Sequence, residues 1–100
     1  MLVELRAEAR DDLVEGAWFY GRQSLGLDDY FIECLREELR NLETTFGVHE
    51  KYRGFYRKLS RRFPFAIYYL LTDVAVDVVA ILDCRIDPSA TDVRLRRTRR

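Results

Sequence analysis

The sequence predicts a single α+β domain in which a two-helix hairpin packs on a small antiparallel sheet of about four strands, in the order β-α-α-β-β-β. Three observations predict this class. Apolar residues recur at intervals of three and four between residues 7 and 46, which indicates two amphipathic helices. A two-residue alternation follows over residues 52–59. Two dense apolar runs separated by a short polar break then fill residues 65–82, which is typical of a β-hairpin.

Length and composition suit one domain. The chain has 100 residues, of which 48% are hydrophobic and 34% are charged, so a single core of ordinary size can form. No apolar run reaches the roughly 18 residues that cross a membrane, and the first residues lack the basic and apolar segments of a signal peptide. We therefore expect a cytoplasmic protein. Cys34 and Cys84 show no metal-ligand spacing, so we expect two reduced thiols in the core and no metal or cofactor.

Charge is divided unevenly along the chain, although the formal net charge is zero. Residues 1–50 contain 5 Lys/Arg and 12 Asp/Glu, whereas residues 51–100 contain 12 Lys/Arg and 5 Asp/Glu. This asymmetry favours an anionic partner for the second half, either nucleic acid or an acidic protein segment. The alternative is that an acidic helical layer and a basic sheet simply keep the domain soluble. Charge alone leaves both interpretations open.

The first part of the chain predicts a short strand and a helix. Residues 2–5 are expected to join the sheet as its first strand. Acidic side chains crowd the first turns of the helix predicted over residues 7–21, where the helix dipole favours negative charge. Gly26 can adopt the left-handed conformation that ends a helix, and Asp28 can cap the next one. The core-facing stripe of the first helix consists of Ala9, Leu13, Ala17 and Tyr20.

A second helix is predicted over residues 29–44. Its apolar residues are separated by four, four, three and four positions, and the charged residues on its other faces can pair at helical spacing. Because only a few residues join the two helices, we expect an antiparallel hairpin whose apolar faces cover one side of the sheet. The stripe of the second helix consists of Phe31, Leu35, Leu39, Leu42 and Phe46.

The remaining strands are expected to form the centre of the sheet. Residues 52–59 read as one strand, with Tyr52 and Tyr56 on the same face. Residues 65–71 and 74–82 are almost wholly β-branched, aromatic and aliphatic, which predicts two central strands joined as a hairpin. Charged residues lie at the outer ends of both runs, so the hairpin brings them to one end of the sheet.

The segment after Pro88 contains few apolar residues, and arginine occupies five of its last seven positions. Such a composition favours solvation over core packing. We expect residues 88–100 to form a short basic tail, mobile or ordered by a partner, with at most one helical turn near Pro88 or Ser89.

Three motifs follow one another on the predicted sheet: Tyr56-Arg57-Lys58, the RFPF-AIYY segment at residues 62–69, and the ILDCRIDP segment at residues 81–88. Together they resemble the RelE/ParE superfamily, the toxins of bacterial type II toxin-antitoxin modules. The resemblance covers nearly the whole chain up to Pro88. RFPF-AIYY followed by a strand ending in R-x-D-P is similar to the ParE-like branch, which is often labelled plasmid stabilisation proteins.

The resemblance implies two alternative activities. ParE-like members poison DNA gyrase as protein ligands, whereas RelE-like members cut messenger RNA on the ribosome. In a nuclease, Lys58, Arg85 and Tyr56 would be the catalytic residues. That set is incomplete, because Ala66 and Tyr56 stand where the nuclease branch has an arginine and a lysine. Asp83 also places an anion beside Arg85. The sequence therefore favours a gyrase inhibitor without catalytic residues, with the mRNA endonuclease as the alternative.

Two surfaces are expected to bind partners. Trp18 and Phe19 lie outside the predicted stripe and are candidates for a groove that an antitoxin fills in a hetero-oligomer. Alternatively, Trp18 widens the core-facing stripe.

The arginine-rich tail and the aromatic sheet also leave open two other functions, a nucleic-acid-binding module or an inactive family member. His49 is the only histidine and lacks a recognisable catalytic constellation. The residues expected to contact the target are Tyr56, Arg57, Lys58, Arg61, Arg62 and Arg85.

Overall fold

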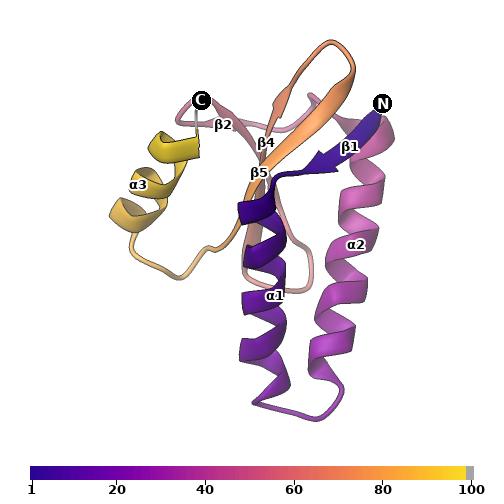
Figure 1. The fold of residues 1–100 in the computed structure, drawn as a ribbon, viewed down its shortest axis with the longest axis vertical. Coiled ribbons are helices and arrows are strands. Elements are labelled where there is room, and N and C mark those ends of the chain that lie inside the picture. The colour runs from indigo at the N-terminus through magenta and orange to yellow at the C-terminus, as the bar shows by residue number, and fades with distance from the viewer. Residues whose placement is uncertain (99–100) are drawn as a thin grey trace.

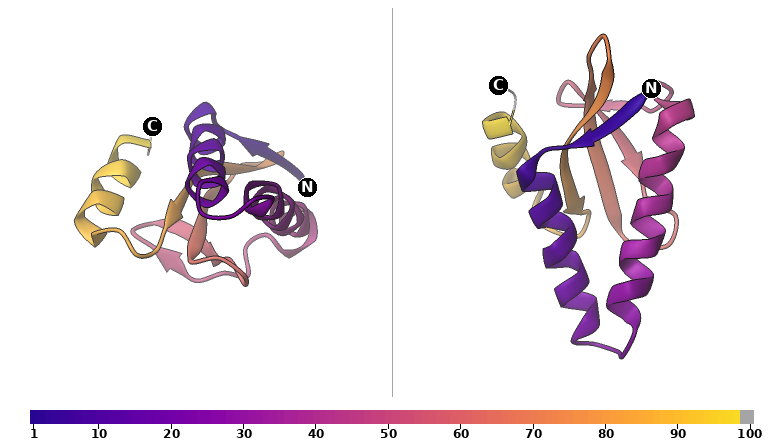
Figure 2. Two further views of the ribbon diagram at one scale, coloured as in Figure 1. Left: turned by 90° about the horizontal axis from the view of Figure 1, so that it is seen from below. Right: turned by 45° about the vertical axis from the view of Figure 1, so that its right-hand side comes forward.

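A five-stranded sheet separates a pair of long helices from a shorter C-terminal helix in the computed structural model, which describes residues 1–98 (Figure 1). The two long helices stand side by side and project beyond the sheet at their connecting turn (Figure 2). In chain order, the elements are β1 (Leu2–Leu5), α1 (Ala7–Gly21), α2 (Leu27–Thr45), β2 (Lys51–Tyr52), β3 (Phe55–Leu59), β4 (Phe65–Leu71), β5 (Ala75–Asp83) and α3 (Pro88–Thr98).

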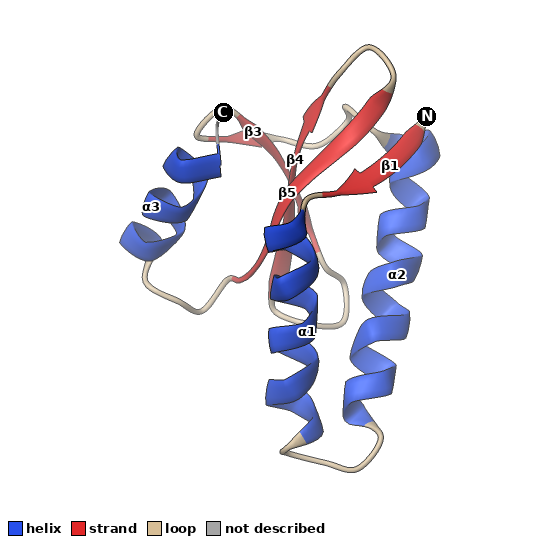
Figure 3. Cartoon of the chain, viewed as in Figure 1, coloured by secondary structure: helices blue, strands red, loops and turns tan. Residues whose placement is uncertain are grey.

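The strand order across the sheet is β1-β5-β4-β3-β2, and Figure 3 labels the first four strands of this order. β4 and β5 form the central hairpin that the sequence predicts, and β3 and β2 continue the antiparallel pairing beyond β4. The predicted α+β class and the order of helices and strands are confirmed. The sheet has five strands rather than about four, and it is mixed, because β1 lies in parallel beside β5.

The predicted strand over residues 52–59 is divided by a tight turn. Arg53 and Gly54 both have positive φ, at 54° and 86°, which matches a two-residue hairpin connection. The turn pairs Tyr52 with Phe55 across the two short strands, so Tyr52 shares a face with Phe55 and not with Tyr56. The sequence expectation for Tyr52 was therefore wrong, because an arginine at the first turn position hides the turn signal.

The helical hairpin follows its prediction except at two points. α2 begins at Leu27 after Gly26, whose φ is 84°, and Asp28 lies within the first helical turn. Asp28 therefore does not cap α2 but complements the positive end of its dipole. On α1, Gly16 is buried and Ala17 only partly so. A Cβ at Gly16 would lie 2.6 Å from the Phe31 ring, so only glycine allows this close approach.

An aromatic cluster of Tyr20, Phe31, Phe63 and Phe65 joins the helical hairpin to the sheet. The Tyr20 and Phe63 ring centroids are 4.9 Å apart, and those of Phe31 and Phe65 are 5.0 Å apart. Pairs of this kind each contribute about 0.5–1.5 kcal/mol beyond their buried area. The cluster fixes the connection between β3 and β4 against both helices at one end of the sheet. Of the two cysteines, only Cys34 is buried near this cluster; Cys84 is exposed, so its predicted place in the core was wrong.

The C-terminal segment is an ordered helix, so the predicted basic tail was wrong for residues 88–98; residues 99 and 100 lie outside the described part of the chain. α3 packs on the face of the sheet opposite α1 and α2 (Figure 2). Leu95 is its one fully buried large apolar side chain, and it joins Phe55 and Val79 in a second, smaller core.

Polar contacts also attach α3 to the rest of the chain. Arg94 forms a bidentate ion pair with Asp12 of α1, with both N···O distances at 2.8 Å. The Arg6 guanidinium donates to the Asp77 carboxylate of β5 and to the backbone carbonyl of Thr98, the last residue of α3. Sequence composition could not reveal this helix, because its partners lie on α1, β2 and β5 and become neighbours only in the fold.

Among residues 1–98, none of the helices has both the length and the hydrophobicity that a membrane span requires. The same part of the chain contains no group of three or more His, Cys, Asp or Glu residues placed to hold a metal ion.

Candidate functional site

The outer face of α1 carries an exposed apolar ridge formed by Val14, Trp18 and Phe19. Trp18 is 70% exposed and Phe19 is 39% exposed, so Trp18 does not widen the core-facing stripe. Two hollows of about 360 and 220 Å³ flank Phe19, and both are also lined by Glu15. A groove therefore runs from Trp18 across Phe19 to Ile86, where β5 leads into α3. Large exposed aromatic side chains beside hollows are typical of protein interfaces.

Arg85 lies at the end of this groove and is tightly held. Its guanidinium donates two hydrogen bonds to the Asp83 carboxylate, at 3.0 and 2.7 Å. It lies 5.8 Å from the Phe19 ring centroid and also donates to the Tyr20 hydroxyl. These bonds to Asp83 raise the pKa of Arg85 and lower the pKa of Asp83. The predicted proximity of Asp83 and Arg85 is therefore present as a bidentate ion pair.

Arg61 and Arg62 lie at the same end of the sheet as Arg85. The backbone N–H of Cys84 donates to the Pro64 carbonyl at 2.7 Å, which joins the β3–β4 connection to the segment after β5. Arg62 donates to the Tyr30 hydroxyl at 2.6 Å, and the backbone of Arg61 donates to the Glu38 carboxylate. Both arginine side chains are exposed. The fold thus brings three of the predicted target-binding arginines to one end of the sheet, with Arg85 against α1 and Arg61 and Arg62 against α2. We call this region the basic end.

Tyr56, Arg57 and Lys58 do not share one face of β3. Arg57 pairs with Tyr68 on the α3 side of the sheet, and its guanidinium lies 4.8 Å from the Tyr52 ring centroid. Tyr56 stacks on Tyr69 with centroids 5.1 Å apart, on the side of α1 and α2. Lys58 follows the same alternation as Tyr56. The six residues predicted to contact the target therefore form the basic end and two separate clusters on opposite faces of β3.

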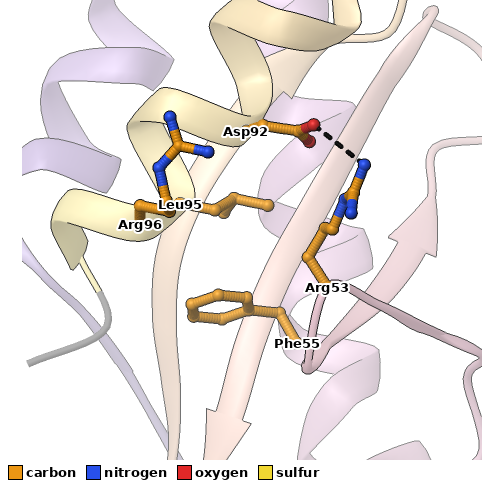
Figure 4. A pocket seen from close by; sticks show the side chains of 5 residues that line it. All are labelled: Arg53, Phe55, Asp92, Leu95 and Arg96. Carbon is orange, nitrogen blue, oxygen red and sulfur yellow. Dashed lines mark ion pairs between the residues drawn. The ribbon is translucent and has the colours of Figure 1, made fainter.

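A further hollow that the sequence did not reveal lies between the β2–β3 turn and α3 (Figure 4). Its volume is about 290 Å³. Phe55 and Leu95 form its apolar walls, while Asp92, Arg96 and Arg53 bring charge to it (Figure 4). The hollow combines residues about 40 positions apart, and no local pattern in the sequence marks it.

Comparison with known proteins adds one finding. No protein-family model matches the sequence, and no curated protein sequence matches it at a significant level. Among solved structures, the chain is similar to a chain of the "Chromosomal ParDE TA system from P. aeruginosa", with a TM-score of 0.68 and 16% sequence identity. The similarity covers 81% of this chain and 92% of that chain. This chain has a ParE-like fold.

The predicted resemblance of the fold is thereby confirmed. At 16% identity, the likeness concerns the backbone architecture, and roles of individual residues do not follow from it. The ParE-like fold nevertheless fixes which surfaces are available: the α1 ridge on one side, the basic end at the end of the sheet, and the hollow beneath α3 on the opposite face.

A buried tyrosine of the sheet, Tyr69, determines which ring nitrogen of His49 is unprotonated. The Tyr69 hydroxyl accepts the Gly47 backbone N–H at 3.0 Å and lies 2.6 Å from Nδ1 of His49. Tyr69 is fully buried, so its hydroxyl proton needs an acceptor, and the unprotonated Nδ1 provides it. Burial and the charge of Lys58 lower the pKa of His49. We assign His49 a structural bond rather than a role as general base.

This bond predicts a pH dependence of stability. Because the folded-state pKa of His49 lies below its unfolded value of about 6.5, the unfolded chain binds a proton more readily as the pH falls below about 6.5. The stabilising contribution is therefore complete above that pH and is lost as the pH falls toward the folded-state pKa. We expect His49→Gln to reduce the loss of unfolding free energy between pH 7.5 and 5, measured by urea denaturation. Equal losses in both proteins would contradict this assignment.

Proposed function

We propose that the chain is the toxin of a bacterial type II toxin-antitoxin module, a cytoplasmic ParE-like inhibitor of DNA gyrase. The observation that carries this proposal is the ParE-like fold, which aligns with 92% of a chain from a ParDE system. The motifs on β3, β4 and β5 that resemble the ParE-like branch give independent support. An inhibitor of this kind acts as a protein ligand, so it needs binding surfaces and no catalytic group.

The arrangement of basic residues favours binding over mRNA cleavage. Catalysis by a nuclease requires cations free to stabilise charge on the phosphate, whereas Arg85 already forms two hydrogen bonds to Asp83. Arg57 and Lys58 lie on opposite faces of β3 and so cannot both contact one phosphate. The position in β4 that would supply another cation is Ala66, which is fully buried. The mRNA endonuclease therefore remains the less supported alternative.

We assign contact with the target to the basic end. Arg61 and Arg62 are exposed, and none of the ion pairs among residues 1–98 involves them, so we expect these two side chains to bond to the target. Arg85 lies at the same end of the sheet, where its guanidinium is held by Asp83. Arginine makes bidentate hydrogen bonds to carboxylates and is enriched at the energetic centres of interfaces. Tyr56, Arg57 and Lys58 lie outside the basic end, on the two faces of β3, and would add contacts only to a target that reaches past the end of the sheet. An acidic surface of the gyrase is the partner that this charge distribution fits best.

We assign antitoxin binding to the α1 ridge. Trp18 and Phe19 offer a large apolar area beside two hollows, into which an amphipathic segment of the antitoxin can place its side chains. The ridge and the basic end adjoin at the contact between Arg85 and Phe19. A bound antitoxin would therefore also cover part of the surface assigned to the target, which would explain neutralisation.

Inducible expression of the chain in bacteria that lack its antitoxin tests the proposed activity. We expect growth arrest with induction of the DNA-damage response, while bulk mRNA stays intact. Rapid mRNA loss without DNA damage would instead assign the chain to the endonuclease alternative. Normal growth with abundant folded protein would contradict both toxin activities.

A further inference from the structure

We propose that Glu38 of α2 is a positioning residue for the basic end. It holds the connection between β3 and β4, residues 60–64, so that Arg61 and Arg62 are already arranged for the target before binding. Its role in binding rests on the proposed function, since that assigns the target contact to these two arginines. The burial of the Glu38 carboxylate, the bonds that it accepts and the hollow beside it assign this role.

The Glu38 side chain is buried without a cationic partner. Among residues 1–98, no charged residue is more deeply buried than Glu38, which is 7% exposed. Buried carboxylates are usually paired with a cation, but none of the ion pairs in this part of the chain involves Glu38. No protein group donates to its Oε1 atom. Burial of such a charge adds little to stability or lowers it, so stability alone does not account for a glutamate at this position.

The other carboxylate oxygen, Oε2, joins α2 to the connection. It accepts the backbone N–H of Arg61 at 3.0 Å and the hydroxyl of Ser60 at 3.2 Å. Hydrogen bonds to an ionised group are roughly twice as strong as those between neutral groups. The carboxylate therefore fixes the backbone just after β3 ends and directly before Arg62.

The second half of the connection is held by other contacts. Phe63 packs into the aromatic cluster beside both helices, and the Pro64 carbonyl accepts a backbone N–H from the segment after β5 at 2.7 Å. Arg62 reaches α2 through its side chain, which donates to the Tyr30 hydroxyl. Glu38 is thus the group of α2 that holds the backbone in the first half of the connection.

A hollow of about 260 Å³ lies between α2 and the connection, so close apolar packing does not fix this part of the chain. A segment beside such a hollow has room to move, and its conformation depends on the few bonds that cross the gap. Without the Glu38 bonds, both arginines would have to be ordered when the target binds, which weakens affinity. The hollow is lined by Cys34, Glu37, Glu38, Asn41, Arg61 and Arg62.

Three variants test this role. Glu38→Met keeps the length and helix propensity of the side chain but removes the carboxylate acceptor. We expect it to unfold at nearly the same urea concentration as the wild-type chain, because removal of a buried charge offsets the two lost bonds. Glu38→Gln is the conservative variant, which keeps one carbonyl oxygen for the Arg61 N–H. Glu37→Met is the matched control, because Glu37 is the exposed neighbour on α2 and lines the same hollow.

Amide hydrogen exchange of the full chain measures the order of the connection without any target. We expect exchange at Arg61 to be about tenfold faster in Glu38→Met, unchanged in Glu37→Met and intermediate in Glu38→Gln. The Cys84 amide, which bonds to Pro64, should exchange at one rate in all four proteins, because their global stability is similar. Equal protection of Arg61 in all four would overturn the proposal.

Titration of the same proteins into purified gyrase measures the effect on target binding. We expect about tenfold weaker binding by Glu38→Met, partial recovery in Glu38→Gln and no loss in Glu37→Met. A merely structural role would leave the affinity of the folded variant unchanged. Unchanged affinity of Glu38→Met, or an equal loss in Glu37→Met, would therefore overturn the proposal. Failure of the wild-type chain to bind gyrase would instead overturn the proposed function, and exchange at Arg61 would then decide whether Glu38 holds the connection.

Discussion

Replacing Trp18 by alanine is expected to weaken antitoxin binding about 100-fold while leaving the fold intact. The side chain is 70% exposed, so its removal takes little buried area from the folded chain. In the proposed complex it is the largest apolar group on the α1 ridge and adjoins the 360 Å³ hollow. Aromatic residues at such positions commonly contribute 2–4 kcal/mol to binding, and 2.7 kcal/mol corresponds to a factor of about 100.

Leu25→Ala provides the matched control. Leu25 is 102% exposed in the turn between α1 and α2, and it lines neither hollow of the ridge. Calorimetric titration of the antitoxin into both variants separates a specific contact from a general loss of exposed apolar surface. Unchanged affinity of the Trp18 variant, or an equal loss in the Leu25 variant, would contradict the assignment of the ridge.

Replacing Asp12 by alanine is expected to lower the free energy of unfolding by about 3 kcal/mol. Asp12 forms the bidentate ion pair with Arg94, and it also accepts the backbone N–H of Ile81 at 2.9 Å. The Asp12 side chain is only 10% exposed and the Arg94 side chain only 16%. Removing one partner of a buried pair leaves the other charge unpaired, which typically costs 3–5 kcal/mol.

Asp11→Ala is the control for this change, because Asp11 is the exposed neighbour on the same helix. Urea denaturation should show a change within about 0.5 kcal/mol for that variant. Hydrogen exchange of the α3 amides should accelerate only in the Asp12 variant, since α3 loses its attachment to α1. Equal stability of the two variants would show that α3 is held by Leu95 and its other contacts alone.

The parts of the fold that the sequence predicted are those whose signals are local. The apolar runs of β4 and β5 and the stripe of α2 are periodic patterns, so their position and type follow from a few neighbouring residues. The parts that it missed depend on distant partners. α3 has one buried large apolar side chain, Leu95, and its other attachments are polar bonds to Asp12, Tyr52 and Arg6.

The candidate site shows the same division. Arg61, Arg62 and Arg85 were predicted at one end of the sheet, because residues that flank a hairpin necessarily meet there. The sequence left open whether Trp18 is exposed or widens the core-facing stripe of α1, and the structure places its side chain in solvent. The hollow beneath α3 was not predictable. An arginine at position 53 is not a residue that signals a turn, and Phe55 contacts Leu95 only once α3 has packed on the sheet.

Purified DNA gyrase gives the most direct test of the proposed toxin activity. The chain is incubated with gyrase, ATP and supercoiled plasmid, and the DNA is examined after protein digestion. We expect linear plasmid only when both proteins are present, and protection when the antitoxin is added first. Intact plasmid at an excess of folded chain, together with cleavage of ribosome-bound mRNA by the same preparation, would contradict the proposed inhibition of gyrase.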